Sequence, residues 1–213
     1  MALKIAILSQ KGGVGKSTLS RALAIEYARH EWAVKIADMD LKQGTSTNWN
    51  RERMKNGYSP EIAVEIFAKV KDVLKQENQY DLIIFDGAGS ADLQTLEIAK
   101  ASDFIILPSG LAKDDLTPQI KLAHELTKKG VDRKHIGISL SRVGKSDREL
   151  TDTIDYIGLA GYKYLGHIKE KTSISQCHDE GLASNETKYQ SINELVDELI
   201  QSISDHLETT SKK

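Results

Sequence analysis

The sequence predicts an α/β fold with one domain, built on a doubly wound, mostly parallel sheet flanked by helices. Short apolar runs of strand length alternate with amphipathic stretches along the chain. Most runs are apolar on both faces, as in buried parallel strands that are covered on two sides. No repeat, low-complexity segment or proline-rich linker interrupts this alternation. We therefore expect a single domain over 1–208 and a flexible C-terminal tail over 209–213.

Seven apolar runs are expected to form the strands. Each has the length of a strand, and helical stretches separate them, as a doubly wound sheet requires. The last run, YKYLGHI, is less apolar than the others. The expected strands span residues 3–8, 33–37, 63–67, 81–85, 103–107, 135–140 and 162–168.

The amphipathic stretches between these runs are expected to form helices. In one of them Leu116, Ile120 and Ala123 recur at helical spacing, and Gly130 ends the stretch. The expected helices span residues 16–29, 45–55, 69–77, 91–100, 115–129, 146–159 and 171–180.

A last helix is expected over about 190–207. One face is apolar and should dock on the domain, whereas the opposite face is acidic and unsuited to anionic lipid. Docking is therefore favoured over membrane anchoring. The apolar face carries Ile192, Leu195, Val196, Leu199, Ile200, Ile203 and Leu207, and the acidic face carries Glu194, Asp197, Glu198 and Asp205.

Composition narrows the class of protein. The chain of 213 residues has a formal net charge of −2, which excludes a globally basic nucleic-acid binder but leaves room for a local basic patch. The single cysteine, Cys177, cannot form an internal disulfide, so we expect a reducing, cytoplasmic environment. The N-terminus shows no signal-peptide pattern, and no apolar run approaches the ~20 residues of a membrane span.

The segment Ser9–Thr18, SQKGGVGKST, follows the first strand and opens the first helix. Glycines allow backbone N–H groups to curl around phosphate oxygens, and the helix N-terminus favours an anion. Lys16 is placed to meet the β- and γ-phosphates of a nucleotide, and the Ser17 hydroxyl is placed to bind Mg²⁺. The alternative is a glycine-rich turn. Gln10 occupies the position of the first glycine of the usual phosphate loop, and a second lysine, Lys11, follows it.

Two further motifs carry carboxylates at the ends of strands. Asp86 ends LIIFD and is predicted to support Mg²⁺, with a polar strand end or a helix cap as the alternative. Asp38 and Asp40 end the second strand and share one face of an extended chain. One of them is suited to orienting the attacking water and the other to supporting Mg²⁺ or the loop; a charged turn is the alternative.

With these motifs the chain resembles the ParA/MinD family of deviant Walker-A ATPases, most of all the short ParA-type plasmid partition ATPases. The matching segments are KGGVGKS at 11–17, DMD at 38–40, LIIFDGAGS at 82–90 and PSGLAKDDL at 108–116, which includes Asp115. The similarity extends over essentially the whole chain and is strongest in residues 1–118. It implies a P-loop ATPase domain that uses ATP/ADP and Mg²⁺.

The resemblance also implies roles for single residues. Lys11 would reach across an ATP-dependent homodimer to the partner's nucleotide; an exposed loop lysine is the alternative. Asp40 would position the hydrolytic water, and Asp38 would support the metal with Ser17 and Asp86. Arg142 and segment 168–175 would flank adenine. The remaining nucleotide contacts fall on Gly12, Gly13, Val14, Gly15, Lys16 and Thr18, the last at the α-phosphate.

One segment departs from the family pattern. The family usually has proline and glutamine directly after the second aspartate, but here Leu41, Lys42 and Gln43 follow Asp40. The loop that controls hydrolysis can therefore be built differently from that of the family. Gln43 stands one position later than the family's glutamine and is a candidate for the same role.

The resemblance implies an ATPase that binds DNA nonspecifically as an ATP dimer and segregates plasmid or chromosomal DNA. Its weak hydrolysis would be stimulated by a centromere-binding or adaptor protein, and its location would be cytoplasmic, on the nucleoid. Binding to DNA phosphates requires basic side chains; the alternative is a solvated surface of mixed charge. The candidates are Lys163, Lys169, Lys171 and Lys188, and a second cluster of Arg142, Lys145 and Arg148.

Other uses of an ATP-dependent homodimer stay open, as does another class of enzyme. A related ATPase could position an organelle or protein cargo. A MinD-like membrane-associated positioner is disfavoured by the acidic last helix, and a metabolic phosphotransferase is disfavoured by Lys11. Trp32 and Trp49 are interpreted as packing residues rather than as platforms for bases.

Overall fold

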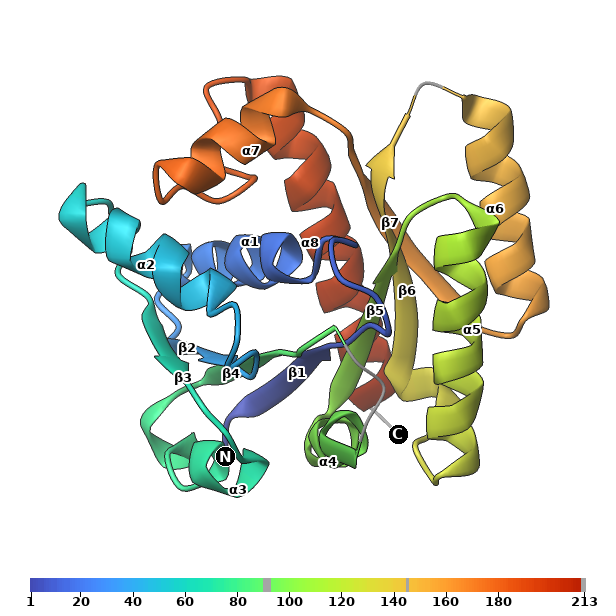
Figure 1. Ribbon diagram of the computed structural model, residues 1–213, viewed down its shortest axis with the longest axis horizontal. Coiled ribbons are helices and arrows are strands. Elements are labelled where there is room, and N and C mark those ends of the chain that lie inside the picture. The colour runs from blue at the N-terminus through green and yellow to red at the C-terminus, as the bar shows by residue number, and fades with distance from the viewer. Residues whose placement is uncertain (90–92, 145, 212–213) are drawn as a thin grey trace.

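The computed structural model describes residues 1–89, 93–144 and 146–211 and contains one seven-stranded sheet (Figure 1). All pairings between its strands are parallel, so the expected fold class is confirmed. All seven expected strands are present, in the order β3-β2-β4-β1-β5-β6-β7. They are β1 (Leu3–Ile7), β2 (Val34–Asp38), β3 (Ala63–Ile66), β4 (Leu82–Asp86), β5 (Phe104–Ser109), β6 (Ile136–Val143) and β7 (Lys163–Lys169).

Helices cover both faces of the sheet (Figure 1). Helices α1, α2, α7 and α8 lie on one face, and α3, α4, α5 and α6 lie on the other. The α-helices are α1 (Lys16–Arg29), α2 (Thr45–Lys55), α3 (Val70–Leu74), α4 (Leu93–Ala101), α5 (Lys113–Lys128), α6 (Asp147–Leu159), α7 (Thr172–Asp179) and α8 (Gln190–Ser211). Two short 3₁₀ turns, η1 (Glu77–Gln79) and η2 (Arg133–His135), complete the elements.

Three helices differ from the predicted ranges. The stretch 69–77 forms the short α3, with η1 after it. Helix α4 begins at Leu93, and residues 91 and 92 of its expected start lie outside the described residues. Helix α8 continues to Ser211, where the hydroxyls of Thr209 and Thr210 donate to carbonyl groups of the preceding turn. Residues 209–211, which were expected in the tail, are therefore helical.

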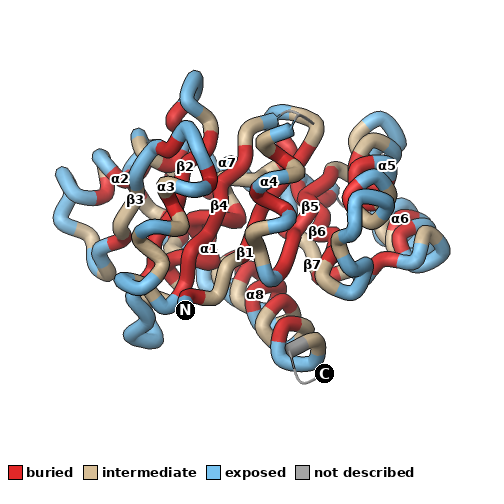
Figure 2. Tube along the Cα trace, turned by 90° about the horizontal axis from the view of Figure 1, so that it is seen from below, coloured by how far each residue is buried: buried red, intermediate tan, exposed pale blue. Residues whose placement is uncertain are grey.

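Burial is concentrated along the strands and on the helix faces that meet them (Figure 2). Two apolar cores result, one on each face of the sheet. Each fully buried aliphatic or aromatic side chain in them contributes about 1.5–3 kcal/mol. Among the helices that the structure describes, none combines the length and apolar character needed to cross a membrane.

The strand order places a crevice at the carboxyl end of β1. From β1 the chain moves to β2 on one side, and after β4 it crosses to β5 on the other side. Ligands of open α/β sheets bind where the strand order reverses in this way. Asp38 of β2 pairs in register with Asp86 of β4, which also pairs with Ile7 of β1. The loops after these three strands therefore meet at one place.

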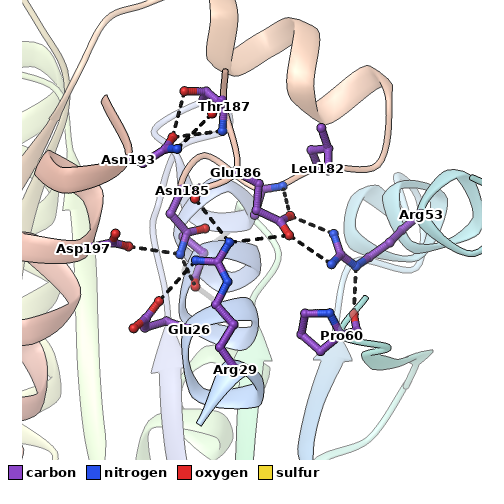
Figure 3. A network of polar contacts seen from close by, with 12 residues as sticks. Glu26, Arg29, Arg53, Pro60, Leu182, Asn185, Glu186, Thr187, Asn193 and Asp197 are labelled. Carbon is purple, nitrogen blue, oxygen red and sulfur yellow. Dashed lines mark hydrogen bonds and ion pairs between the residues drawn. The ribbon is translucent and has the colours of Figure 1, made fainter. Parts of the chain in front are cut away.

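A buried ion pair fixes the far end of α2 (Figure 3). The Arg53 guanidinium donates to both carboxylate oxygens of Glu186, at 2.7 and 3.0 Å, and the Arg53 side chain is only 1% exposed. Gly181 packs directly on the backbone of Arg53, where a Cβ atom would lie 2.3 Å from the Arg53 nitrogen. Arg29 of α1 approaches the same carboxylate at 3.8 Å. The segment before α8 is thus attached to α1 and α2.

Candidate nucleotide-binding site

A cavity of about 840 Å³ opens at the carboxyl ends of the central strands. Its volume suits a ligand of nucleotide size. It joins the glycine loop after β1, the loops after β2 and β4, the end of β6, and the segment from β7 into α7. The predicted site residues that line it are Gly12, Gly13, Gly15, Lys16, Ser17, Thr18, Asp38, Asp40, Asp86 and Arg142.

The glycine loop is held against β6. The Ser141 hydroxyl donates to the carbonyl of Val14 at 2.6 Å, so Val14 contributes its backbone rather than a cavity wall. Gly15 has a φ of 93° and lies so close to Ser141 that a Cβ atom would be 3.1 Å from the serine Cβ. Helix α1 begins directly afterwards at Lys16. Its first N–H groups are therefore presented to the cavity, as a phosphate site requires.

Lys16 lies inside the site. Its ammonium donates to the carbonyl of Lys11 at 3.3 Å, across the curl of the loop. Burial lowers the pKa of Lys16, and the charges of Asp86 and Asp40 act in the opposite direction. A buried ammonium whose partner is a neutral carbonyl is well placed to bind a phosphate oxygen.

Asp86 is one of two buried carboxylates of the site, with 2% of its surface exposed. Its Oδ2 accepts from the Ser46 hydroxyl at 2.6 Å, whereas Oδ1 is buried and has no hydrogen-bond partner of standard geometry among the described residues. Burial raises the pKa of Asp86, and the hydroxyls of Ser46 and Ser17 lower it. An orphaned carboxylate oxygen beside the Ser17 hydroxyl fits the oxygen ligands that Mg²⁺ prefers.

The Asp38 side chain, at the end of β2, caps the N-terminal end of α2. Its Oδ2 accepts from the backbone of Ser46 and Thr47, both at 3.1 Å, and from the Thr47 hydroxyl at 3.2 Å. Its Oδ1 accepts from the backbone of Asp40 at 3.2 Å. A carboxylate cap on the first N–H groups of a helix contributes about 1–2 kcal/mol. Asp38 thus supports the site by positioning α2.

Asp40 shapes the loop that follows β2. Its Oδ1 accepts from the backbone of Lys42 and Gln43, both at 3.1 Å, and its carbonyl accepts from Gly44 at 3.0 Å. The side chain also lines the cavity. Among the described residues, none donates a hydrogen bond to its Oδ2.

Lys11 is oriented differently from Lys16. Its ammonium forms an ion pair with Asp115 of α5 at 3.0 Å, and 42% of its side chain is exposed. The Ser9 hydroxyl accepts from the Lys11 backbone at 2.9 Å and holds this end of the loop. Lys11 lies outside the cavity of its own chain.

The predicted base-binding elements come together on one side of the cavity. Arg142 is exposed, has a φ of 55°, and extends its guanidinium over Gly13. Most of the predicted wall at 168–175 also lines the cavity, through Ile168, Lys169, Glu170, Lys171, Ile174 and Ser175.

Three residues of the site were not identified from the sequence. Ser46 holds Asp86, as described above. Arg21 of α1 lines the cavity beside the two buried aspartates, and its spacing of four residues from Ser17 on one helix was a detectable signal. His178 of α7 also lines the cavity, and burial lowers its pKa to about 4, so its ring is neutral at physiological pH.

Comparison with known proteins points to nucleotide binding. The family model described as the CobQ/CobB/MinD/ParA nucleotide binding domain matches residues 5–184. The maintenance of carboxysome distribution protein A of Gloeobacter kilaueensis is 32% identical over 121 residues, which are 56% of this chain and 55% of that protein. The match thus spans about half the length of this curated relative.

Two solved structures show the same fold. The septum site-determining protein MinD of Pyrococcus horikoshii OT3, in complex with Mg-ADP, aligns with a TM-score of 0.76 and 19% identity over 95% of this chain and 96% of that one. A Borrelia burgdorferi B31 protein assigned to plasmid partition, bound to AMPPNP, aligns with a TM-score of 0.75 and 19% identity over 96% of this chain and 99% of that one.

The position of Lys16 predicts that Lys16→Ala removes nucleotide binding. A charge-assisted hydrogen bond to phosphate contributes about 1.5–3 kcal/mol, so we expect affinity for ATP to fall by about 10- to 150-fold. A fluorescent ATP analogue titrated in the presence of Mg²⁺ measures this. The control is Lys129→Ala, at an exposed lysine after α5. Wild-type affinity in Lys16→Ala would contradict the assignment of the phosphate site.

Proposed function

The chain belongs to the CobQ/CobB/MinD/ParA nucleotide-binding family, and we propose that it is a Mg²⁺-dependent ATPase that dimerises with ATP and positions cargo on DNA. The observation that carries this proposal is the unequal orientation of two lysines in one loop. Lys16 points into the site of its own chain, whereas Lys11 is exposed and paired outside it.

The residues present suit a nucleotide with its metal. Gly12–Thr18 would enclose the phosphates, and Ser17 and Asp86 would hold Mg²⁺. Bound Mg²⁺ would neutralise charge on the phosphates during transfer. Arg142 and the wall at 168–175 would flank adenine, and support for this comes from their shared position in the cavity lining, where the Glu170 N–H donates to the carbonyl of Val143. The relatives bound to Mg-ADP and AMPPNP support the same ligand class.

Hydrolysis is assigned to Asp40. Its carboxylate borders the cavity, and its backbone contacts hold the loop before α2. A carboxylate at this place, with one oxygen that accepts no bond from the described residues, can orient and polarise a water molecule for attack on the γ-phosphate.

Dimerisation is assigned to Lys11. In the single chain its charge is matched by Asp115, at a contact that is partly exposed and therefore weak. A triphosphate on a second copy offers a stronger partner, because several oxygens share its negative charge. Exchange of Asp115 for the partner's phosphates would link nucleotide state to assembly.

Cargo is the least constrained part of the proposal. Nonspecific DNA is the leading candidate for the surface on which the cargo would be positioned. The candidate DNA contacts that are exposed are Lys163, Lys169, Lys171, Lys188 and Arg148. Lys145 of the second basic cluster lies outside the described residues. Such a protein would act on the nucleoid in the cytoplasm, and a centromere-binding or adaptor protein would stimulate its weak hydrolysis.

A second candidate is the positioning of a protein compartment or complex by the same switch. The observation that favours it is the 32% identity to a carboxysome distribution protein. A membrane-associated positioner is disfavoured, because α8 docks on the sheet through buried Val196, Leu199 and Ile203 and directs acidic residues outward.

We expect Lys11→Ala to bind ATP with wild-type affinity but to lose the ATP dimer. Removing one member of an interfacial charge contact costs about 2–5 kcal/mol, so dimer affinity should fall by at least about 30-fold. Sedimentation velocity with ATP and with ADP measures this, with Lys75→Ala, an exposed lysine after α3, as the control. A Lys11→Ala protein that dimerises normally with ATP would exclude the bridging role.

Asp40→Ala should bind ATP and dimerise, but its turnover should fall by about 100-fold or more, because water is no longer polarised. Asp40→Asn separates two roles, since its amide oxygen can still accept from Lys42 and Gln43 while the charge is lost. Phosphate release is the measurement. Full activity in Asp40→Asn would assign Asp40 to loop geometry alone.

DNA binding should require ATP and fall with salt. We expect the logarithm of the binding constant to decline linearly with the logarithm of salt concentration, as for proteins that neutralise several phosphates. Mobility shifts of unrelated duplexes with ATP, with ADP and without nucleotide measure this. Absence of an ATP-dependent shift at low salt would favour a cargo other than DNA.

A further inference from the structure

A buried arginine connects the phosphate-binding helix to α2. Arg21 of α1 is 4% exposed, and its Nη2 donates to the carbonyl of Thr45, the first residue of α2, at 2.7 Å. Its guanidinium also lies 5.4 Å from the centre of the Trp49 ring. Arg21 therefore contacts both the first turn and the middle of α2.

The same side chain faces the reaction site. Ser17 and Arg21 are four residues apart on α1, so they share one side of the helix. Arg21 lines the cavity, and Asp86 and Asp38 are the carboxylates whose charges favour its ionised form. Burial lowers the pKa of Arg21 to about 10, so it remains a cation at physiological pH.

The first turn of α2 orients both buried carboxylates. Ser46 and Thr47 donate their backbone N–H groups to Asp38, and the Ser46 hydroxyl donates to Asp86. A shift of this turn would move both aspartates and the start of the loop at 40–44. The contact from Arg21 to Thr45 fixes the turn from the side of α1.

The middle and the far end of α2 are anchored by further contacts. The Arg53 guanidinium also lies near the Trp49 ring, at 5.6 Å from its centre, and the Trp49 Nε1 donates to the carbonyl of Leu182 at 3.0 Å. Arg53 is in turn held by Glu186 (Figure 3). With the far end fixed in this way, Arg21 sets the position of the near end.

We propose that Arg21 is a positioning residue for ATP hydrolysis. It holds the first turn of α2 against α1 and thereby keeps Asp38, Asp86 and the Asp40 loop in the arrangement that hydrolysis needs. This role rests on the proposed ATPase function. A purely structural role for a buried side chain would not require a charge beside the magnesium ligands, and burying a charge carries a desolvation cost.

The test compares Arg21→Met, Arg21→Lys and the control Arg29→Met. Arg29 lies two turns further along α1, outside the cavity. For each protein we would measure ATP affinity, turnover, thermal unfolding, and hydrogen exchange of residues 39–50 without nucleotide. The exchange measurement is independent of bound metal and of activity.

We expect Arg21→Met to lower kcat by about ten-fold or more while the Kd for ATP changes by less than about two-fold, because misplacement of a site costs rate rather than ground-state binding. Exchange of the Ser46 and Thr47 amides should be faster by about ten-fold once the turn is released. Arg21→Lys keeps a cation and a donor, and should recover kcat to within about three-fold of wild type. Arg29→Met should leave kcat and this exchange unchanged.

The outcomes separate the two proposals. A wild-type protein that hydrolyses no ATP overturns both. An active wild type with equal turnover and equal exchange in Arg21→Met overturns the positioning role alone. The positioning role is also overturned if Arg21→Met and Arg21→Lys both lose turnover and the loss in each matches its loss of folded protein. If Arg21→Met fails to fold, Arg21→Lys with unchanged exchange and reduced turnover also overturns the role.

Discussion

The buried carboxylate of Asp38 must be hydrogen bonded, and much of the site follows from how this is done. The side chain is 1% exposed at the end of a central strand, where an unpaired charge would be strongly unfavourable. It accepts four hydrogen bonds, three from the first turn of α2 and one from Asp40. A single acidic group therefore connects β2, the loop at 40–44 and α2. Any arrangement that left Asp38 free to bind metal directly would leave that turn of α2 uncapped.

The two lysines of the glycine loop differ because the backbone between them curls. The carbonyl of Lys11 turns inward and accepts from the Lys16 ammonium, while the side chain of Lys11 is directed out toward α5. Burial lowers the pKa of Lys16, whereas 42% of the Lys11 side chain is exposed. One loop thus presents one cation to its own cavity and another to its surroundings. That division is what the proposed ATP-bridged dimer requires.

The sequence predicted those features that depend on local residue patterns. The strands, the glycine loop and the position of Asp86 are short-range features, and the structure places them as expected. The capping role of Asp38 was out of reach, because its donors lie eight and nine residues away and depend on how α2 packs. The Arg53–Glu186 pair spans 133 residues, and no periodicity in one sequence indicates such a contact. Arg21 falls between these cases, since its spacing from Ser17 was visible but its burial was not.

The departure of this chain from the family pattern after Asp40 concerns side chains more than backbone. The loop is held by bonds from the N–H groups of Lys42, Gln43 and Gly44 to Asp40, and any residue other than proline can supply such groups. Leu41 directs its side chain outward and is 59% exposed. A proline at position 41, as the family usually has, would remove a donor that this loop does not use for Asp40. The change from proline to Leu41 therefore alters the surface beside the cavity, where the proposed second chain would approach, and leaves the hydrogen bonds to Asp40 in place.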